Sequence, residues 1–345
     1  MDFSRINRRR VLAAAAMAAS ALAGPSAAAP RVEKGKVHLV VGGQTLLHHL
    51  PLVLADQLGY FRSEGLSVEI TDAGSPARAL QLIADGGFDV CAGPYEHTLV
   101  LQGRGHLHQA FVVQARTPQV AFGLSMRGGV REISDLRGKR IGLAQSATVD
   151  AMVATQVLAR AGVRLDEVSL IELGPSTSAA SAVRGGVVDA LSHFDPVMTM
   201  LEQRGEVKIL ADTRTTRGTL ELFGALLPSS CLHATAEFVQ KNPAICQALS
   251  HAVVHALKWL QTAGPGDLIK TVPDHYFQGD RALYLASFMK VRGSMSPDGL
   301  MPADGAQAAL QALLSLNPSL RVDRAGLMRS YTNEFARKAK DRFKA

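Results

Sequence analysis

Short β-branched segments alternate with helical segments in this chain, and the alternation occurs in two series that resemble each other. Gly74-Ser75-Pro76 in the first series has a counterpart, Gly174-Pro175-Ser176, in the second. A second pair of related motifs, residues 85–89 and 184–189, has nearly the same offset. Strands that alternate with helices form parallel sheets, because a chain that returns to the same edge of a sheet needs a crossover. The repeat therefore predicts two α/β lobes of similar construction.

Hydrophobic periodicity predicts where these strands and helices lie. The expected strands are 36–43, 66–73, 88–93 and 109–114 in the first series, and 139–144, 168–173, 187–191 and 207–210 in the second. The expected helices between them are 51–61, 76–85, 95–103, 148–161, 177–184 and 196–203. The rest of the chain is mainly helical, with helices expected at 234–239, 243–262, 281–290, 306–316 and 324–340.

Two apolar segments, 119–126 and 218–228, are expected to be extended and to connect the lobes. The first would carry the chain into lobe II, residues 123–223, and the second would return it to lobe I. Lobe I is then discontinuous and comprises residues 31–122 and 224–345. The expected fold is α/β, with two mainly parallel sheets flanked by helices and joined by a two-segment hinge. Such a hinge allows two lobes to close around a ligand.

The first 28 residues are interpreted as a signal peptide of the twin-arginine type. Arg8-Arg9-Arg10 directly precede an apolar stretch, 11–22, and small residues follow up to Pro30. We expect cleavage near Ala28, which would leave an exported, periplasmic protein. The apolar stretch is short of the roughly 20 residues that a membrane-spanning helix needs.

Charge and cysteine content narrow the class of protein further. The formal net charge of +7 falls to about +4 once the signal peptide is removed, and no basic run is interleaved with aromatic residues. We therefore expect no nucleic-acid partner. Cys91, Cys231 and Cys246 form no CxxC pair, which excludes a disulfide framework. Cys231 and Cys246 could pair in an oxidising compartment, although the helical apolar pattern around Cys246 favours two buried thiols.

Metal, cofactor and catalytic motifs are missing from the sequence. The histidine pairs are His48 with His49, His106 with His108, and His251 with His255. None of these pairs has a third ligand at a usual spacing, so we expect no metal site. GxSxG, HExxH, GxxxxGK[ST] and GxGxxG are absent, so we expect neither a cofactor nor an enzyme.

Four stretches occur in an order that is typical of one family. They are PLVLADQLGYF at 51–61, EGLSVE at 64–69, ISDLRGKRIG at 133–142, and GVVDA at 186–190 followed by Asp195-Pro196. The chain resembles the periplasmic binding proteins for nitrate, taurine and aliphatic sulfonates and their relatives for the thiamine pyrimidine precursor. The resemblance implies a type II periplasmic-binding-protein fold, a ligand held between the lobes, and partners that are the permease and ATPase subunits of an ABC transporter. We expect the protein to be a monomer.

Four strand-to-helix junctions are rich in small and hydroxyl residues, and each is expected to offer free backbone N–H groups. They are 42–45, 74–76, 145–148 and 174–177. A helix N-terminus carries partial positive charge and can hold an anion. The candidate ligand contacts at these junctions are Gln44, Thr45, Ser75, Ser146, Thr148 and Ser176. In the alternative interpretation, the serines only cap their helices.

Five further residues are candidates for the same cleft. Tyr95 could stack on a flat ligand and His97 could donate to an anion, or Tyr95 and Glu96 could simply begin a helix with His97 on its surface. His193 lies at the end of a strand where the resembling family lines its cleft. Asp195 could recognise an amine or merely cap the helix that follows.

These features together predict a solute-binding protein that captures a small organic anion, a sulfonate or a carboxylate, and delivers it to a permease. Two alternatives remain open. One is a ligand-sensing periplasmic protein, which needs the same closing cleft. The other is a lyase-like enzyme on the same scaffold, in which Glu96 or Asp195 would act as acid or base. The branch of the family that makes the thiamine pyrimidine uses a cysteine-rich cluster, which the three scattered cysteines do not match.

Overall fold

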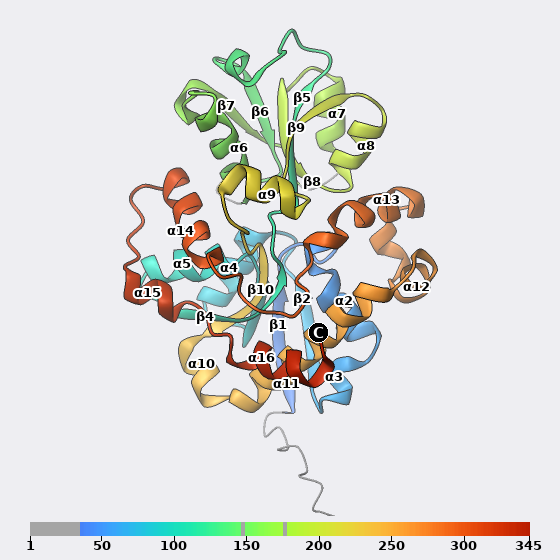
Figure 1. Cartoon of the computed structure of the whole chain (residues 1–345), viewed down its shortest axis with the longest axis vertical. Coiled ribbons are helices and arrows are strands. Elements are labelled where there is room, and N and C mark those ends of the chain that lie inside the picture. The colour runs from blue at the N-terminus through green and yellow to red at the C-terminus, as the bar shows by residue number, and fades with distance from the viewer. Residues whose placement is uncertain (1–34, 146–148, 175–177) are drawn as a thin grey trace, which may run out of the picture.

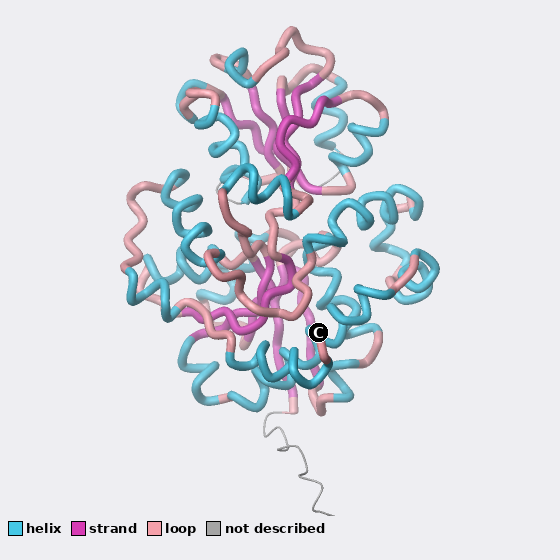
Figure 2. Tube along the Cα trace, viewed as in Figure 1, coloured by secondary structure: helices cyan, strands magenta, loops and turns pink. Residues whose placement is uncertain are grey.

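The computed structural model describes residues 35–145, 149–174 and 178–345. The predicted signal peptide and the candidates Ser146, Thr148 and Ser176 lie outside the described residues. Two five-stranded sheets, each flanked by helices, form the two lobes seen in Figures 1 and 2. We call the lobe with the sheet β2-β1-β3-β10-β4 lobe I, and the lobe with the sheet β7-β6-β8-β5-β9 lobe II. Among the described helices, none is long and apolar enough to cross a membrane.

Lobe I holds the first strands of the chain and nearly all of its last third. Its strands are β1 (Lys36–Val41), β2 (Ser67–Asp72), β3 (Val90–Gly93), β4 (His108–Ala115) and β10 (Ser230–Thr235). Strand β1 pairs in parallel with β2 and β3, whereas β10 lies antiparallel between β3 and β4. The helices of this lobe before β4 are α2 (Leu50–Gln57), α3 (Tyr60–Ser63), α4 (Pro76–Ala84) and α5 (Glu96–Gly103).

Lobe II repeats this arrangement. Its strands are β5 (Val120–Ser125), β6 (Arg140–Leu143), β7 (Ser169–Glu172), β8 (Ala190–Phe194) and β9 (Val207–Asp212). Its helices are α6 (Val149–Arg160), α7 (Ser178–Arg184), α8 (Val197–Gln203) and α9 (Thr216–Phe223). One strand in each sheet, β10 in lobe I and β5 in lobe II, is antiparallel to both of its neighbours, and the other four strands share one direction. Both β5 and β10 come directly after the chain has crossed from one lobe to the other. The expected α/β class with two mainly parallel sheets is therefore confirmed.

The second crossing between the lobes differs from the prediction. Segment 218–228 was expected to be extended, but it contains most of helix α9. Thr215 caps this helix by accepting a hydrogen bond from the backbone N–H of Gly218, and Gly224, with φ of 74°, ends it. The chain then enters β10, a strand that was not expected. Because Thr235 caps α10 (Ala236–Lys241), the helix predicted at 234–239 begins two residues later.

The remaining helices complete lobe I. They are α11 (Pro243–Thr262), α12 (Pro265–Thr271), α13 (Arg281–Val291), α14 (Gly305–Leu316), α15 (Arg324–Arg329) and α16 (Glu334–Phe343). Helix α12 was not predicted. The helix expected at 51–61 is divided at Gly59, whose φ of 72° is left-handed, and the one expected at 324–340 is divided between α15 and α16.

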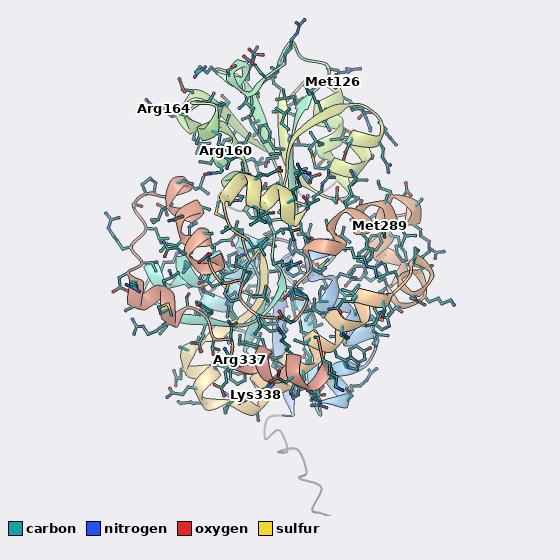
Figure 3. All side chains as sticks on the ribbon, in the orientation of Figure 1. Met126, Arg160, Arg164, Met289, Arg337 and Lys338 are labelled. Carbon is teal, nitrogen blue, oxygen red and sulfur yellow. The ribbon has the colours of Figure 1, made fainter. Side chains whose placement is uncertain are left out.

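The core of lobe I lies between its sheet and α11, and α16 packs against both α11 and strand β4 (Figure 1). Helix α14 belongs to the part of the chain that returns to lobe I, yet it packs against α6 of lobe II. Apolar side chains of both lobes therefore form one continuous cluster at this junction. Most of the exposed side chains labelled in Figure 3, such as Arg164 and Lys338, are charged, whereas Met126 and Met289 are exposed apolar residues.

Candidate functional site

A cavity of about 90 Å³ lies between the two lobes, at the ends of strands from both sheets. Its lining residues are Gly43, Leu46, Gly74, Ser75, Pro76, Ala144, Gln145, Glu172, Gly174 and Phe194. Each of the four predicted junctions contributes at least one of them. The carboxyl ends of parallel strands are the usual ligand site of open α/β sheets, because the loops there lead into helix N-termini. We therefore take this interlobe cavity as the candidate ligand site and call it the cleft.

Carboxylates within each lobe organise the junctions. Asp72 at the end of β2 accepts hydrogen bonds from the N–H groups of Gly43, Gln44 and Gly74, at 2.8 to 3.0 Å. Asp150 in α6 accepts from the N–H groups of Ala144 and Gln145, at 2.7 and 3.1 Å. The prediction that the junctions offer free backbone amides is therefore wrong at four junction positions, Gly43, Gln44, Gly74 and Gln145, because carboxylates of the protein already use these amides.

Gly42 brings the first two junctions into direct contact. A Cβ atom at this position would lie 2.6 Å from Pro76 N and from the carbonyl oxygen of Ser75. Real Cβ atoms do not approach backbone atoms so closely, so the end of β1 and the start of α4 pack this tightly only because residue 42 is glycine. This close approach fixes where Ser75 and Pro76 enter the cleft.

Ser75 lines the cleft and also caps α4, since its Oγ accepts a hydrogen bond from Arg78 N at 3.3 Å. Both interpretations of this serine are therefore compatible with the structure. Gln44 and Thr45 lie in the loop after β1 but are not among the lining residues. Phe194 at the end of β8 contributes an aromatic ring, which lies 5.7 Å from the ring of the buried His48.

Tyr95, Glu96 and His97 lie at the start of α5 and away from the cleft. Tyr95 is fully buried and its hydroxyl is hydrogen-bonded to Ser330 at 2.5 Å, so its ring has no face open to a ligand. Glu96 and His97 line a different cavity of about 600 Å³, which α4, α5, α6 and α14 surround. Burial raises the pKa of Glu96 to about 8 and lowers the pKa of His97 to about 3, so both side chains are mainly neutral at pH 7.

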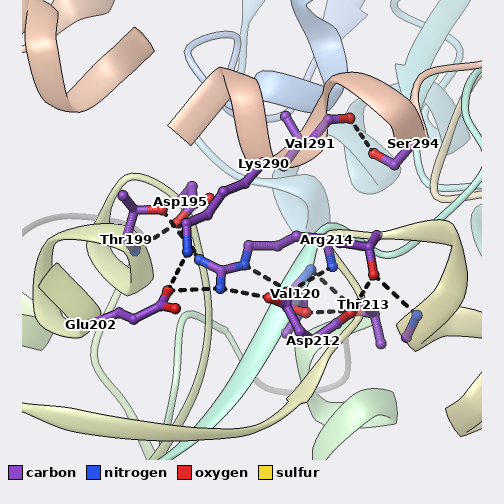
Figure 4. Close-up of polar contacts among 12 residues, drawn as sticks. Val120, Asp195, Thr199, Glu202, Asp212, Thr213, Arg214, Lys290, Val291 and Ser294 are labelled. Atoms are coloured by element: carbon purple, nitrogen blue, oxygen red, sulfur yellow. Dashed lines mark hydrogen bonds and ion pairs between the residues drawn. The ribbon is translucent and has the colours of Figure 1, made fainter. Parts of the chain in front are cut away.

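His193 and Asp195 hold the end of β8 in place. One ring nitrogen of His193 lies 2.9 Å from the carbonyl oxygen of Gly174, which anchors the fourth junction. Asp195 Oδ1 accepts a hydrogen bond from Thr199 N at 2.8 Å and lies 3.3 Å from a guanidinium nitrogen of Arg214 (Figure 4). Asp195 therefore caps α8, and a cation of the protein already occupies the position that a ligand amine would take.

Arg214 is the residue of this region that the sequence analysis missed. It is fully buried and is bonded to Asp195, Asp212 and Glu202, and Glu202 also binds Lys290 of lobe I (Figure 4). Burial opposes the charge of Arg214, yet the surrounding carboxylates raise its pKa. No local sequence signal marks this network, because its members come from the ends of β8 and β9, from α8 and from α13.

Two lobes that share this strand arrangement, with a small cleft between them, define a protein of the periplasmic-binding-protein fold. A family model described as "NMT1/THI5 like" matches residues 47–263. The chain belongs to this family, and the match confirms the predicted resemblance.

Solved structures of known proteins agree with this assignment. A protein from Bordetella bronchiseptica RB50 is 40% identical in sequence, with a TM-score of 0.83 over 91% of this chain and 100% of that chain. The periplasmic aliphatic sulphonate binding protein SsuA from Escherichia coli is 17% identical and has a TM-score of 0.69, covering 86% of this chain and 92% of that chain. At this identity the second likeness shows the fold.

An enzyme is also among the relatives. The 4-amino-5-hydroxymethyl-2-methylpyrimidine phosphate synthase of Schizosaccharomyces pombe is 30% identical over 108 residues. The match covers 31% of this chain and 31% of the synthase, so the chain matches less than a third of that enzyme's length.

Proposed function

We propose that this protein is the solute-binding protein of an ATP-powered importer, captures a small organic molecule in the cleft and delivers it to the permease. The observation that carries the proposal is that all four strand-to-helix junctions, two from each lobe, line one small cavity. A ligand there contacts both lobes at once and so stabilises their closed arrangement. The likeness to SsuA and the predicted signal peptide, cleaved near Ala28, support a periplasmic role.

Closure is the proposed mechanism. The chain passes between the sheets twice, once between β4 and β5 and once between α9 and β10. These two connections would act as the hinge. The permease would recognise the closed form, because only then do the surfaces of both lobes have a fixed spacing.

An organic anion, a sulfonate or a carboxylate, is the first ligand class that we propose. Helix α4 begins at the cleft with Ser75 and Pro76, and partial positive charge gathers at such a helix end. A neutral or cationic heterocycle is the second class. Two observations support this second class. Glu172 is the one charged side chain among the described lining residues, and Leu46 and Phe194 offer apolar contacts to a ring.

We further propose that the protein does not catalyse a reaction on its ligand. The two carboxyl groups considered for a lyase have other surroundings. Asp195 is held by Arg214 and Thr199, and Glu96 lies at the separate cavity beside α5. Among the described residues that line the cleft, Glu172 is the only titratable side chain, so they supply no acid and base pair.

A ligand screen tests this proposal. The protein lacking residues 1–28 would be heated with sulfonates, carboxylates, nitrate and substituted pyrimidines in turn, and hits would be confirmed by calorimetry. A ligand at one hundred times its Kd stabilises the folded state by about 2.7 kcal/mol and raises Tm. Chemical analysis of the recovered ligand must show it unchanged, and conversion to a product would contradict the non-catalytic role.

A substitution tests the site itself. Phe194→Ala removes the aromatic wall of the cleft and is expected to weaken binding of the confirmed ligand about tenfold or more. Phe223→Ala, in α9 and outside the cleft lining, is the matched control and is expected to bind as the unmodified protein does. Equal affinities for the two variants would show that the ligand binds elsewhere.

A further inference from the structure

Cys91, His97 and His233 meet in the interior of lobe I. One potential ligand atom of each, the thiol sulfur or a ring nitrogen, lies within 4.8 Å of those of the other two. Cys91 on β3 and His233 on β10 are direct partners in the antiparallel pairing of these strands. His97 belongs to the first turn of α5, and all three side chains are buried. The insertion of β10 beside β3 therefore creates this triad.

Two ring nitrogens of the triad lack a partner. Nδ1 of His97 and Nε2 of His233 are buried and have no hydrogen-bond partner among the described residues. A buried polar atom without a partner destabilises the folded state, so native proteins rarely keep one without a reason. Nδ1 of His233 lies 3.3 Å from Nδ1 of His108, and this contact orients the imidazole ring. Metal-binding histidines are commonly oriented in this way through their second nitrogen.

The environment keeps both imidazoles in the form that binds metals. Burial lowers the pKa of His97 to about 3 and the pKa of His233 well below its usual value, so both rings are neutral and retain a lone pair. Burial also raises the pKa of the Cys91 thiol. A bound cation would reverse this effect, because coordination deprotonates a thiol.

Gly93 leaves room beside the triad. A Cβ atom there would lie 3.1 Å from Nδ1 of His97 and 3.2 Å from the sulfur of Cys91. His97 also borders the cavity of about 600 Å³ next to α5, which offers a route for an ion from outside.

We propose that the triad binds one thiophilic d¹⁰ metal ion, Zn²⁺ or Cu⁺, through the Cys91 thiolate, Nδ1 of His97 and Nε2 of His233. Thiolate and imidazole are the ligands that both ions share. Cu⁺ is satisfied by these three donors, whereas Zn²⁺ takes a fourth, such as water. Binding releases the thiol proton of Cys91 to solvent. The ion connects β3, α5 and β10. It therefore fixes β10, with which the chain re-enters lobe I, to its neighbour β3.

Metal titration of the full chain tests the proposal. The reduced, metal-free protein would be titrated with Zn²⁺ and, without oxygen, with Cu⁺, each against a competing chelator. We expect one ion per chain for at least one of the two metals, release of about one proton per ion, and a raised Tm. Co²⁺ in place of Zn²⁺ would report the thiolate ligand by a charge-transfer absorption band. If neither Zn²⁺ nor Cu⁺ binds at one ion per chain, the proposal is overturned.

Variants locate the site. Cys91→Ser and His97→Gln are each expected to weaken metal binding at least tenfold. The controls Cys246→Ser and His255→Gln change a cysteine and a histidine outside the triad, and they are expected to leave metal binding unchanged. Gly93→Ala keeps all three ligands but fills the space beside them, so it tests the site if Cys91→Ser does not fold. Metal binding by Cys91→Ser, His97→Gln and Gly93→Ala that equals that of the controls would contradict the assignment.

Discussion

Lys290 Nζ lies 2.6 Å from Glu202 Oε2, and this ion pair joins α13 of lobe I to α8 of lobe II (Figure 4). The same carboxylate oxygen accepts a hydrogen bond from Arg214 at 2.9 Å. The contact between the lobes is therefore continuous with the buried network that holds Asp195 at the end of β8. One set of charges therefore joins the two lobes and holds the end of a cleft strand in place.

The substitution Lys290→Ala is expected to shift the protein toward an open arrangement. About a third of each side chain is exposed, so the pair is worth about 0.2–1 kcal/mol, and its loss lowers the ratio of closed to open molecules by at most about fivefold. Small-angle scattering of the ligand-free protein checks this through a larger radius of gyration. Lys338→Ala, which breaks an exposed pair within α16, is the control. Equal radii for both variants would show that the pair does not hold the lobes together.

Replacement of Arg214 by Ala is expected to destabilise the protein by about 3–5 kcal/mol. Arg214 is fully buried, and its removal leaves Asp195 and its neighbours without their counter-charge. Urea unfolding followed by circular dichroism measures the loss. The control Arg217→Ala removes a largely exposed arginine of α9 and is expected to change the unfolding free energy by less than about 0.5 kcal/mol. A loss below about 1 kcal/mol for Arg214→Ala would contradict the structural role of the network.

Glu96 is expected to make stability fall as pH rises. Its pKa in the folded protein is about 8, mainly because it is buried, against 4.5 for an ordinary glutamate. Between these values the folded state keeps the proton and the unfolded state has lost it, so the free energy of unfolding decreases by about 1.4 kcal/mol per pH unit. The difference in unfolding free energy between the unmodified protein and a Glu96→Gln variant should show this slope from pH 6.5 to 8. The buried histidines, whose pKa values burial lowers, contribute equally to both proteins and cancel in this difference.

Glu96→Gln isolates that contribution, since glutamine does not titrate. The pH dependence of its unfolding free energy is expected to reflect only the groups common to both proteins, among them the buried histidines. Glu334→Gln alters an exposed carboxylate of α16 and should keep the slope of the unmodified protein. Parallel pH profiles for the unmodified protein and Glu96→Gln would show that Glu96 ionises normally.

The repeated strands and helices were predictable because they depend on local periodicity and on capping. Strand β10 was not, because its residues show no clear alternation and it becomes a strand only by pairing with β3 and β4, more than one hundred residues earlier. The apolar residues of segment 218–228 do not reveal helix α9, because the helix starts at the Thr215 cap and only its Thr219 and Leu222 are buried.

The sequence predicted where the cleft lies but not which candidate side chains line it. The rule that ligands lie beyond the ends of parallel strands brought the four junctions together. The burial of Tyr95 depends on Ser330, and the pairing of Asp195 depends on Arg214, and neither partner is near in sequence. The triad around Cys91 was hidden for the same reason, since His233 reaches it only through β10.

Gly42→Ala is expected to damage both the cleft and the stability of lobe I. The added methyl group would lie 2.6 Å from backbone atoms of Ser75 and Pro76, and backbone cannot yield as a flexible side chain can. The start of α4 must therefore move away from β1, and the hydrogen bonds that Asp72 makes to Gly43 and Gly74 must stretch with it. Overpacking of this kind costs about 1–3 kcal/mol of folding stability.

Because Ser75 and Pro76 line the cleft, calorimetry of Gly42→Ala with the ligand from the screen should show affinity lowered about tenfold or more. Gly266→Ala, at a helical position of α12 with no atom near the added methyl group, is the control and should keep both stability and affinity. Unchanged affinity in Gly42→Ala, together with lowered stability, would place the ligand away from the start of α4.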